Sequence, residues 1–231
     1  MRCIRWRSAA GWAAVAAALG WAGLAQAQLG GVTGTITDTT NTVIGTVGGT
    51  TGTVTGTGGT QTTTALVGQA AGATAVVLGN VISLGDSGTL SDPSQPVGGG
   101  QTVGSIPGLL SAETLHSAAM AWTDQVASQA SLSNLVLTVA GTGITADFLG
   151  SEALAVAGAA PTGASAIEGL RVGGVAVSAT GVANQLVSLP GLSVILNEQT
   201  RTASGIVVNA LRVRTLDGLT DVAVGTARAG I

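Results

Sequence analysis

The last third of the chain shows the clearest alternation of apolar and polar positions. Three runs alternate with a period of two residues, and short polar segments separate them. The runs are Leu192–Gln199, Gly205–Arg214 and Leu219–Thr226. Alternation of this kind is typical of strands with one buried face, and the separators, including Asp217-Gly218, suit hairpin turns. We therefore predict an antiparallel meander with Val222 and Val224 on the buried face and Asp221 outward.

Strict alternation also assigns the residues of the first two runs to opposite faces. In the first run, Val194, Leu196 and Glu198 oppose Ile195, Asn197 and Gln199. In the second run, Val207, Asn209, Leu211 and Val213 oppose Ile206, Val208, Ala210, Arg212 and Arg214.

Further strands are predicted along residues 65–231, where Val and Ile are frequent. They are Ala75–Ser83, Gln129–Val139, Ile144–Phe148, Leu154–Ala157, Arg171–Ala179 and Leu186–Leu189. Gly85–Gly108 contains Asp92-Pro93 and three consecutive glycines, and it is predicted to be a loop. Strands without regular helical crossovers favour an all-β fold. We expect a two-sheet antiparallel sandwich, and a curled or solenoid-like β sheet is the alternative.

One segment between residues 111 and 128 departs from this pattern. Leu115, Ala119, Trp122 and Val126 recur at helical spacing, and Ser111 is a suitable N-cap. The local pattern by itself therefore predicts a helix within a domain whose other segments predict strands.

The first 27 residues have the pattern of a secretory signal peptide. Arg2, Arg5 and Arg7 precede an apolar run from Ala9 to Leu24, and Ala25-Gln26-Ala27 forms a small-x-small cleavage site. The run is shorter than the roughly 20 residues needed to span a bilayer. Cleavage before Gln28 is therefore expected, and it leaves no membrane span in the mature chain.

Residues 28–64 are predicted to form a low-complexity spacer ahead of the domain at 65–231. From Leu29 to Thr64 the chain has 16 Thr, 10 Gly and a single charged residue, Asp38. Such a segment has too few large apolar groups to offset the entropy of ordering its glycines. Thr favours strands, however, so edge strands or a regular Thr surface are the alternative. The triplets Thr35–Thr37 and Thr53–Thr55 resemble the Thr ladders of some ice-binding solenoids.

Composition excludes several functions. The eight basic residues are all Arg, and only five of them follow residue 27, against eleven acids, which gives the mature chain a formal charge of −6. No basic cluster is present to bind nucleic acid. With one His and one Cys, Cys3, the chain offers little for a metal site. We predict no cofactor.

Two motifs resemble catalytic or cofactor-binding sequences. Gly85–Gly88 is similar to the nucleophile turn of trypsin-like proteases, with Ser87 at the nucleophile position, but the single His116 follows it instead of preceding it. Gly141–Ala146 spells G-x-G-x-x-A, and Glu168 lies at about the distance of a ribose-binding acid, yet the motif continues as a strand-like alternation. We interpret both as structural.

For glycosidase chemistry, which uses paired carboxylates, Asp124 beside Trp122 is the best-placed acid. Nothing in the sequence singles out a second carboxylate to pair with it.

The C-terminal motifs resemble the choice-of-anchor P family of exported bacterial proteins. The motifs are Leu189–Gln199 with its N-E-Q, Gly205–Val213 with V-N-A-L, and Asp221–Ala227 with D-V-x-x-G-x-A. The resemblance covers roughly Ala75 to Ile231, and it implies an exported all-β domain in which residues 114–133 form strands. It supplies no catalytic residue. The chain carries Arg212 where members often have His, and it stops at Ile231 without a sorting tail, so we expect a freely secreted or periplasmic protein.

We therefore expect a non-enzymatic surface or extracellular protein with a structural or interaction role. Asn197, Glu198, Gln199 and Asn209 are then structural polar groups, and no catalytic, cofactor-binding or metal-binding residue is assigned. A ligand- or polysaccharide-binding module that uses these four residues is the alternative. A hydrolase or an ice-binding protein is a more distant one. The partner is unknown; contact with a cell surface or a polysaccharide is expected, and contact with nucleic acid is not.

Overall fold

The computed structural model describes residues 43–47, 50–54 and 66–231, and these residues are all-β and contain no helix. The strands are β1 (Val43–Val47), β2 (Thr50–Val54), β3 (Val67–Val77), β4 (Asn80–Asp86), β5 (Val97–Ile106), β6 (Leu110–Ala121), β7 (Gln125–Val139), β8 (Thr142–Val156), β9 (Thr162–Glu168), β10 (Arg171–Val172), β11 (Val175–Ala176), β12 (Gln185–Leu189), β13 (Leu192–Arg201), β14 (Gly205–Thr215) and β15 (Thr220–Gly230). The predicted signal peptide and most of the predicted spacer lie outside the described residues.

Within the predicted spacer, β1 and β2 form a two-stranded antiparallel sheet of their own, with Val43 opposite Val54. They belong to a different compact unit from residues 61–231.

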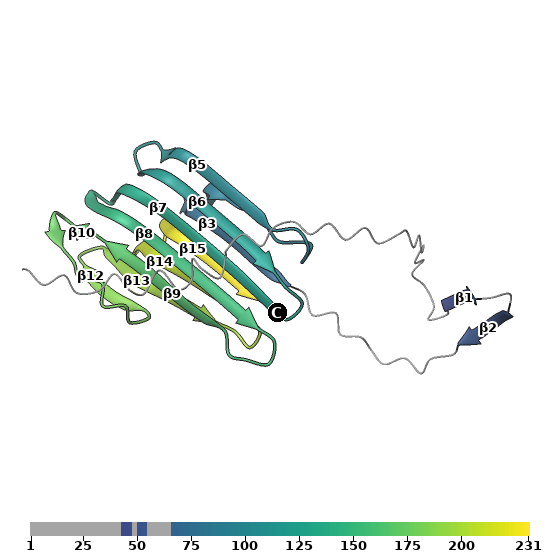
Figure 1. Ribbon diagram of the computed structural model, residues 1–231. Coiled ribbons are helices and arrows are strands. Elements are labelled where there is room, and N and C mark those ends of the chain that lie inside the picture. The colour runs from purple at the N-terminus through teal and green to yellow at the C-terminus, as the bar shows by residue number, and fades with distance from the viewer. Residues whose placement is uncertain (1–42, 48–49, 55–65) are drawn as a thin grey trace, which may run out of the picture. The chain divides into compact units, whose positions relative to one another are not determined.

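Two antiparallel sheets make up the unit that contains residues 66–231, which confirms the predicted sandwich (Figure 1). The six-stranded sheet has the order β12-β13-β14-β15-β3-β4. The seven-stranded sheet has the order β11-β10-β8-β7-β6-β5, and β9 also pairs with β8. Strands β14 and β15 pack across β8, and β3 packs across β6 and β7. The sheets are not closed into a barrel, and β13, β14 and β15 form the predicted meander.

Several predicted boundaries are wrong. The run Ala75–Ser83 is two strands, because Leu78-Gly79 forms a tight turn with both φ angles positive. The predicted loop Gly85–Gly108 contains β5. At Gly99 this strand passes so close to the backbone carbonyl of Asp86 that a side chain would collide with it, and glycine permits the approach. The runs Ile144–Phe148 and Leu154–Ala157 both fall on β8, which ends at Val156, and Arg171–Ala179 holds two short strands, β10 and β11.

Residues 110–139 form the hairpin β6–β7, so the helix predicted from local spacing is wrong here. Leu115, Ala119 and Val126 are all buried, which produced the helical spacing, but the first two lie on one strand and Val126 lies on the next. Trp122 stands at the turn between them and is 41% exposed. The helical spacing of these four residues therefore arises from a strand, a turn and a second strand.

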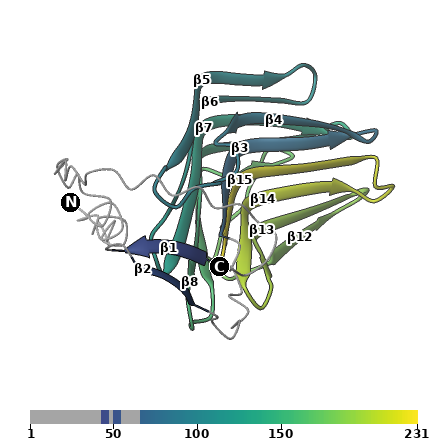
Figure 2. The same cartoon turned by 90° about the vertical axis from the view of Figure 1, so that its right-hand side faces the viewer.

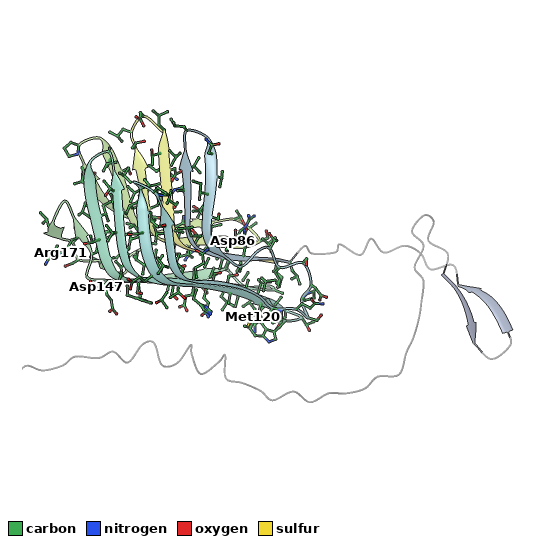
Figure 3. All side chains as sticks on the ribbon, turned by 90° about the horizontal axis from the view of Figure 1, so that it is seen from above. Asp86, Met120, Asp147 and Arg171 are labelled. Atoms are coloured by element: carbon green, nitrogen blue, oxygen red, sulfur yellow. The ribbon has the colours of Figure 1, made fainter. Side chains whose placement is uncertain are left out.

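A line of bends, here called the crease, crosses both sheets at mid-strand (Figure 2). In the six-stranded sheet it passes through Asn197, Ala210, Gly225, Gly72 and Gly85. In the seven-stranded sheet it passes through Gly169, Asp147, Asn134 and Thr114. Six of these residues have left-handed backbone conformations with φ between 49° and 64°: Asn197, Gly225, Gly85, Gly169, Asn134 and Thr114. Figure 3 labels Asp147 at the bend of β8.

The crease reverses which residues face inward, because a strand that bends through a non-extended residue shifts its two-residue alternation. In β14, Val208 and Ala210 are buried before the crease, whereas Leu211 and Val213 are buried after it. The predicted face made of Val207, Asn209, Leu211 and Val213 is therefore wrong. The prediction for β15 holds, since Val222 and Val224 are fully buried.

The crease also separates two kinds of core. One half is filled by large side chains, with Leu110, Leu137, Leu192 and their neighbours. The other half is packed mainly with alanine and valine: Ala121, Val126, Ala153, Ala155, Val208, Ala227 and Ala229. The sheets approach closely there, since a side chain at Gly163 of β9 would collide with Val208.

Candidate functional site: a polar network at the crease

A network of charged and polar side chains lies on the outer surface of the six-stranded sheet, where β13, β14 and β15 meet the crease. Its members are Glu198, Asn209, Arg212, Arg214, Asp221 and Thr226. The residues next to them along β14 and β15, including Val208, Leu211 and Val222, belong to the core, so the network residues of these strands point away from the second sheet. Glu198 stands directly opposite Asn209 and shares its face. It is the largest set of connected side-chain hydrogen bonds in the described residues.

Glu198 is the centre of this network and is 8% exposed. Asn209, directly opposite on β14, donates from Nδ2 to Glu198 Oε2 at 2.6 Å. The Asn209 amide oxygen in turn accepts a hydrogen bond from Thr226 Oγ1 at 2.7 Å. Arg212 and Arg214 also contact the two carboxylate oxygens, so the negative charge of the buried Glu198 is compensated.

Arg212 bridges the two carboxylates of the network. Its Nε and Nη2 donate to the two oxygens of Asp221 at 2.9 and 2.7 Å, a bidentate pair. Its Nη1 donates to Glu198 Oε2 at 3.0 Å. Arg214 stands two residues further along β14, on the same face, with Nη2 at 3.5 Å from Glu198 and Nε at 3.3 Å from Asp221 Oδ2. Two positive and two negative charges therefore balance within the network.

The electrostatics follow from these contacts. The hydrogen bonds from Asp221 raise the pKa of Arg212 against the opposing effect of burial, and Glu198 adds to the rise. Burial acts to raise the pKa of Asp221, but the hydrogen bonds and charge of Arg212, with help from Arg214, hold it below its ordinary value. A lowered carboxyl pKa stabilises the fold at neutral pH, and this stabilisation is lost as the pH falls through that pKa.

The four residues predicted as one polar cluster belong to two groups. Glu198 and Asn209 join the network, whereas Asn197 and Gln199 point toward other segments. Asn197 donates from Nδ2 to the carbonyl of Gly181 at 2.9 Å. Gln199 donates from Nε2 to the carbonyl of Gly163 at 2.9 Å. These two amides therefore attach β13 to the segment before β12 and to β9.

Ser87 follows the end of β4 in the six-stranded sheet, whereas His116 lies on β6 of the seven-stranded sheet. The Ser87 hydroxyl accepts a hydrogen bond from the backbone N–H of Ala70 and donates to the carbonyl of Gly88, so its two directions are used by backbone. His116 is exposed on β6, with Gly100 and Ser131 as its neighbours on the adjacent strands. Among the described residues, no group of three or more His, Cys, Asp or Glu is placed to hold a metal ion.

The remaining sequence motifs are parts of turns and strands. Trp122 and Asp124 stand in the β6–β7 turn, where Trp122 N–H donates to Gln125 and the Asp124 carbonyl accepts from Ala157. The G-x-G-x-x-A motif begins at the β7–β8 turn and continues as β8, and Glu168 ends β9. No helix opens there to bind a pyrophosphate.

Sequence reasoning missed Arg212, Arg214, Asp221 and Thr226 as members of the network. The spacing of Arg212 and Arg214 was a usable signal, because residues two apart on a strand share a face. Two of the five arginines after residue 27 stand at that spacing.

Comparisons with protein-family models, with curated proteins and with solved structures find no match for this chain. No helix among the described residues is long and apolar enough to cross a membrane.

Proposed function

We propose that this protein is an exported, non-enzymatic protein of the cell surface or the extracellular space, with a structural or interaction role. The signal-peptide pattern of residues 1–27 supports export. The resemblance to the choice-of-anchor P family supports the same assignment, and an all-β sandwich is consistent with it. In the non-enzymatic role the domain serves as a folded unit with few charged residues.

One observation carries the non-enzymatic part of the proposal. The charged groups of the network are bound to one another, with Glu198 held by Asn209 and Arg212, and Asp221 held by Arg212. A general acid or base needs a proton that can leave, and a nucleophile needs an adjacent base. Groups committed to internal ion pairs support a stabilising role at the crease.

Export is tested by the mass of the accumulated protein. We expect the mature chain to begin at Gln28 and to be found in the periplasm or the medium, because Ala25–Ala27 fits the cleavage site. Intact-mass spectrometry of fractionated cells measures this directly. A protein that keeps Met1 and stays in the cytoplasm would contradict the proposal.

The alternative, a ligand- or polysaccharide-binding module, is favoured by the half-exposed side chain of Arg214, which is 41% accessible. A matched pair of variants separates the two roles. If the network is structural, Arg212→Met leaves Glu198 buried without its main partner and destabilises the fold by about 3 kcal/mol. Arg214→Met then costs under about 1 kcal/mol, because its pairs are long and partly screened.

Urea unfolding of both variants and binding to a polysaccharide array provide the measurements. The structural role predicts a large stability loss for Arg212→Met, a small one for Arg214→Met, and no glycan binding by the parent. A parent that binds a glycan, together with an Arg214→Met variant that folds normally and loses this binding, would establish the binding module instead.

A further inference from the structure

Strand β5 leaves one long edge of the seven-stranded sheet open. It pairs with β6 on one side, and no described strand pairs with it on the other (Figure 1). It spans ten residues, Val97–Ile106, without one charged residue. Exposed sheet edges are usually protected from pairing with other chains by charged side chains, proline or short length. Within β5 none of these is present, although Pro96 and Pro107 flank it.

The register with β6 determines which residues of β5 face outward. Gly99, Gln101, Gly104 and Ile106 stand opposite the buried residues Ser117, Leu115, Ala112 and Leu110. Gly100, Val103 and Ser105 stand opposite the exposed residues His116, Glu113 and Ser111, and Thr102 lies across from exposed Thr114. The inward set therefore changes from odd to even numbers at the crease. As a result, the order of inward and outward residues is symmetric about the point between Thr102 and Val103.

The hydrogen-bond pattern places the free backbone groups on the outward residues. The backbone N–H of Trp122 donates to the backbone carbonyl of Gln125, at the β7 end of the hairpin. Because alternate residues of an antiparallel strand bond to opposite neighbours, the outward residues of β6 bond to β7 and its inward residues bond to β5. At the far end of β5, the carbonyl of Ile106, an inward residue, accepts from Leu109 across the turn to β6. The outward residues Gly100, Thr102, Val103 and Ser105 therefore present their N–H and C=O groups at the open edge.

We propose that β5 is a self-association edge that pairs antiparallel with β5 of a second copy of this chain, about a two-fold axis between Thr102 and Val103. In this register Thr102 meets Val103 of the second copy, and Gly100 meets Ser105 of the second copy. Outward residues meet outward residues and inward residues meet inward ones, so the creases of the two copies coincide. Four pairs of outward residues then exchange about eight backbone hydrogen bonds.

Charge and side-chain exposure favour a second copy as the occupant. The chain is acidic as a whole, with a formal charge of −3, but residues 97–106 contribute none of that charge. Two identical edges therefore meet without like charges opposite each other. Val103 is 65% exposed in the single chain. At the two-fold axis it packs beside Thr102 of the second copy, and such β-branched cross-strand pairs stabilise sheets.

The test compares two valine-to-lysine variants of the protein, purified in the form in which the cell accumulates it. Light scattering during size-exclusion chromatography over a range of concentrations measures the mass. The parent is expected to form a dimer. Val103→Lys brings two ammonium groups together at the axis and should raise the dissociation constant at least about tenfold, a loss of about 1.4 kcal/mol or more. Val136→Lys, on an exposed residue of β7 in the same sheet, should leave the dimer unchanged.

The register is tested separately by cross-linking in a Cys3→Ser background. Thr102→Cys places two thiols next to the axis, where a short bismaleimide should join the copies, whereas Val136→Cys should not cross-link. A parent that is monomeric at every concentration overturns the proposal. So does a Val103→Lys variant that stays dimeric, or a Val136→Lys variant that dissociates equally. These outcomes leave the proposed export and non-enzymatic role untouched.

Discussion

Val222→Asp is expected to abolish cooperative folding of the 66–231 sandwich. Val222 is fully buried in β15, and its cross-strand neighbours Val213 and Ala75 are fully buried as well. A carboxylate at this position has no partner in the leucine-rich half of the core. Burying an unpaired charge belongs to the small group of substitutions that cost about 4 to 5 kcal/mol or more, which is comparable with the whole stability of many domains.

The matched control places the same aspartate one residue further along. Ala223 lies on the opposite face of β15, half-buried and directly across from Arg212, so Ala223→Asp sets a new carboxylate beside a guanidinium. We expect a change within about 1 kcal/mol. Thermal melts followed by circular dichroism compare the two variants. Equal melting temperatures would mean that β15 has the opposite register, because a shift of one residue exchanges its faces.

The three C-terminal strands could be predicted because each carries an unbroken alternation on one side of the crease, the side on which the turn between β14 and β15 lies. In β15, Val222 and Val224 both precede Gly225, so one phase describes them correctly. In β14 the crease falls at Ala210, in the middle of the predicted run, and a single phase misassigned half of its residues. The strand itself was predicted correctly, but the faces on one side of the bend were not.

The crease could not be predicted from one sequence, because it depends on residues aligned across strands. Asn and Gly tolerate left-handed conformations, but the chain contains 37 glycines, and most of them give no indication of a bend. Only when Asn197, Gly225 and Gly85 stand in line across the sheet does their common φ become meaningful. The Arg212 pairs with Glu198 and Asp221 depend on the same alignment, which explains why the network was only partly predicted.

Strand β5 was missed for a related reason. Its residues Gly98-Gly99-Gly100 have the composition of a loop, and glycine is unfavourable in strands on intrinsic grounds. Tertiary packing reverses this preference, because Gly99 passes against the backbone of Asp86, where no side chain fits. Local composition therefore predicted the opposite of what close approach between the two sheets requires.

The left-handed conformation at Gly225 should make the crease sensitive to substitution there. Gly225 has φ of 60°, and a Cβ atom at this position would stand 3.1 Å from Ala210 Cβ, tighter than ordinary contact. Gly225→Val therefore combines a conformation that costs an L-residue about 1 to 2 kcal/mol with overpacking that costs about 1 to 3 kcal/mol. We expect a total loss of about 2 to 5 kcal/mol, and a fall in melting temperature of roughly 5 to 20 °C.

Gly143→Val is the control for loss of a strand glycine. Gly143 lies near the start of β8, its φ is not positive, and a Cβ atom there meets nothing within 4 Å. The same substitution should therefore change stability by no more than about 0.5 kcal/mol. Urea unfolding measures both variants against the parent. If Gly225→Val is as stable as Gly143→Val, the bend does not require a left-handed residue on β15. The reversal of facing at the crease would then need another cause, because the strand could cross that line in an extended conformation.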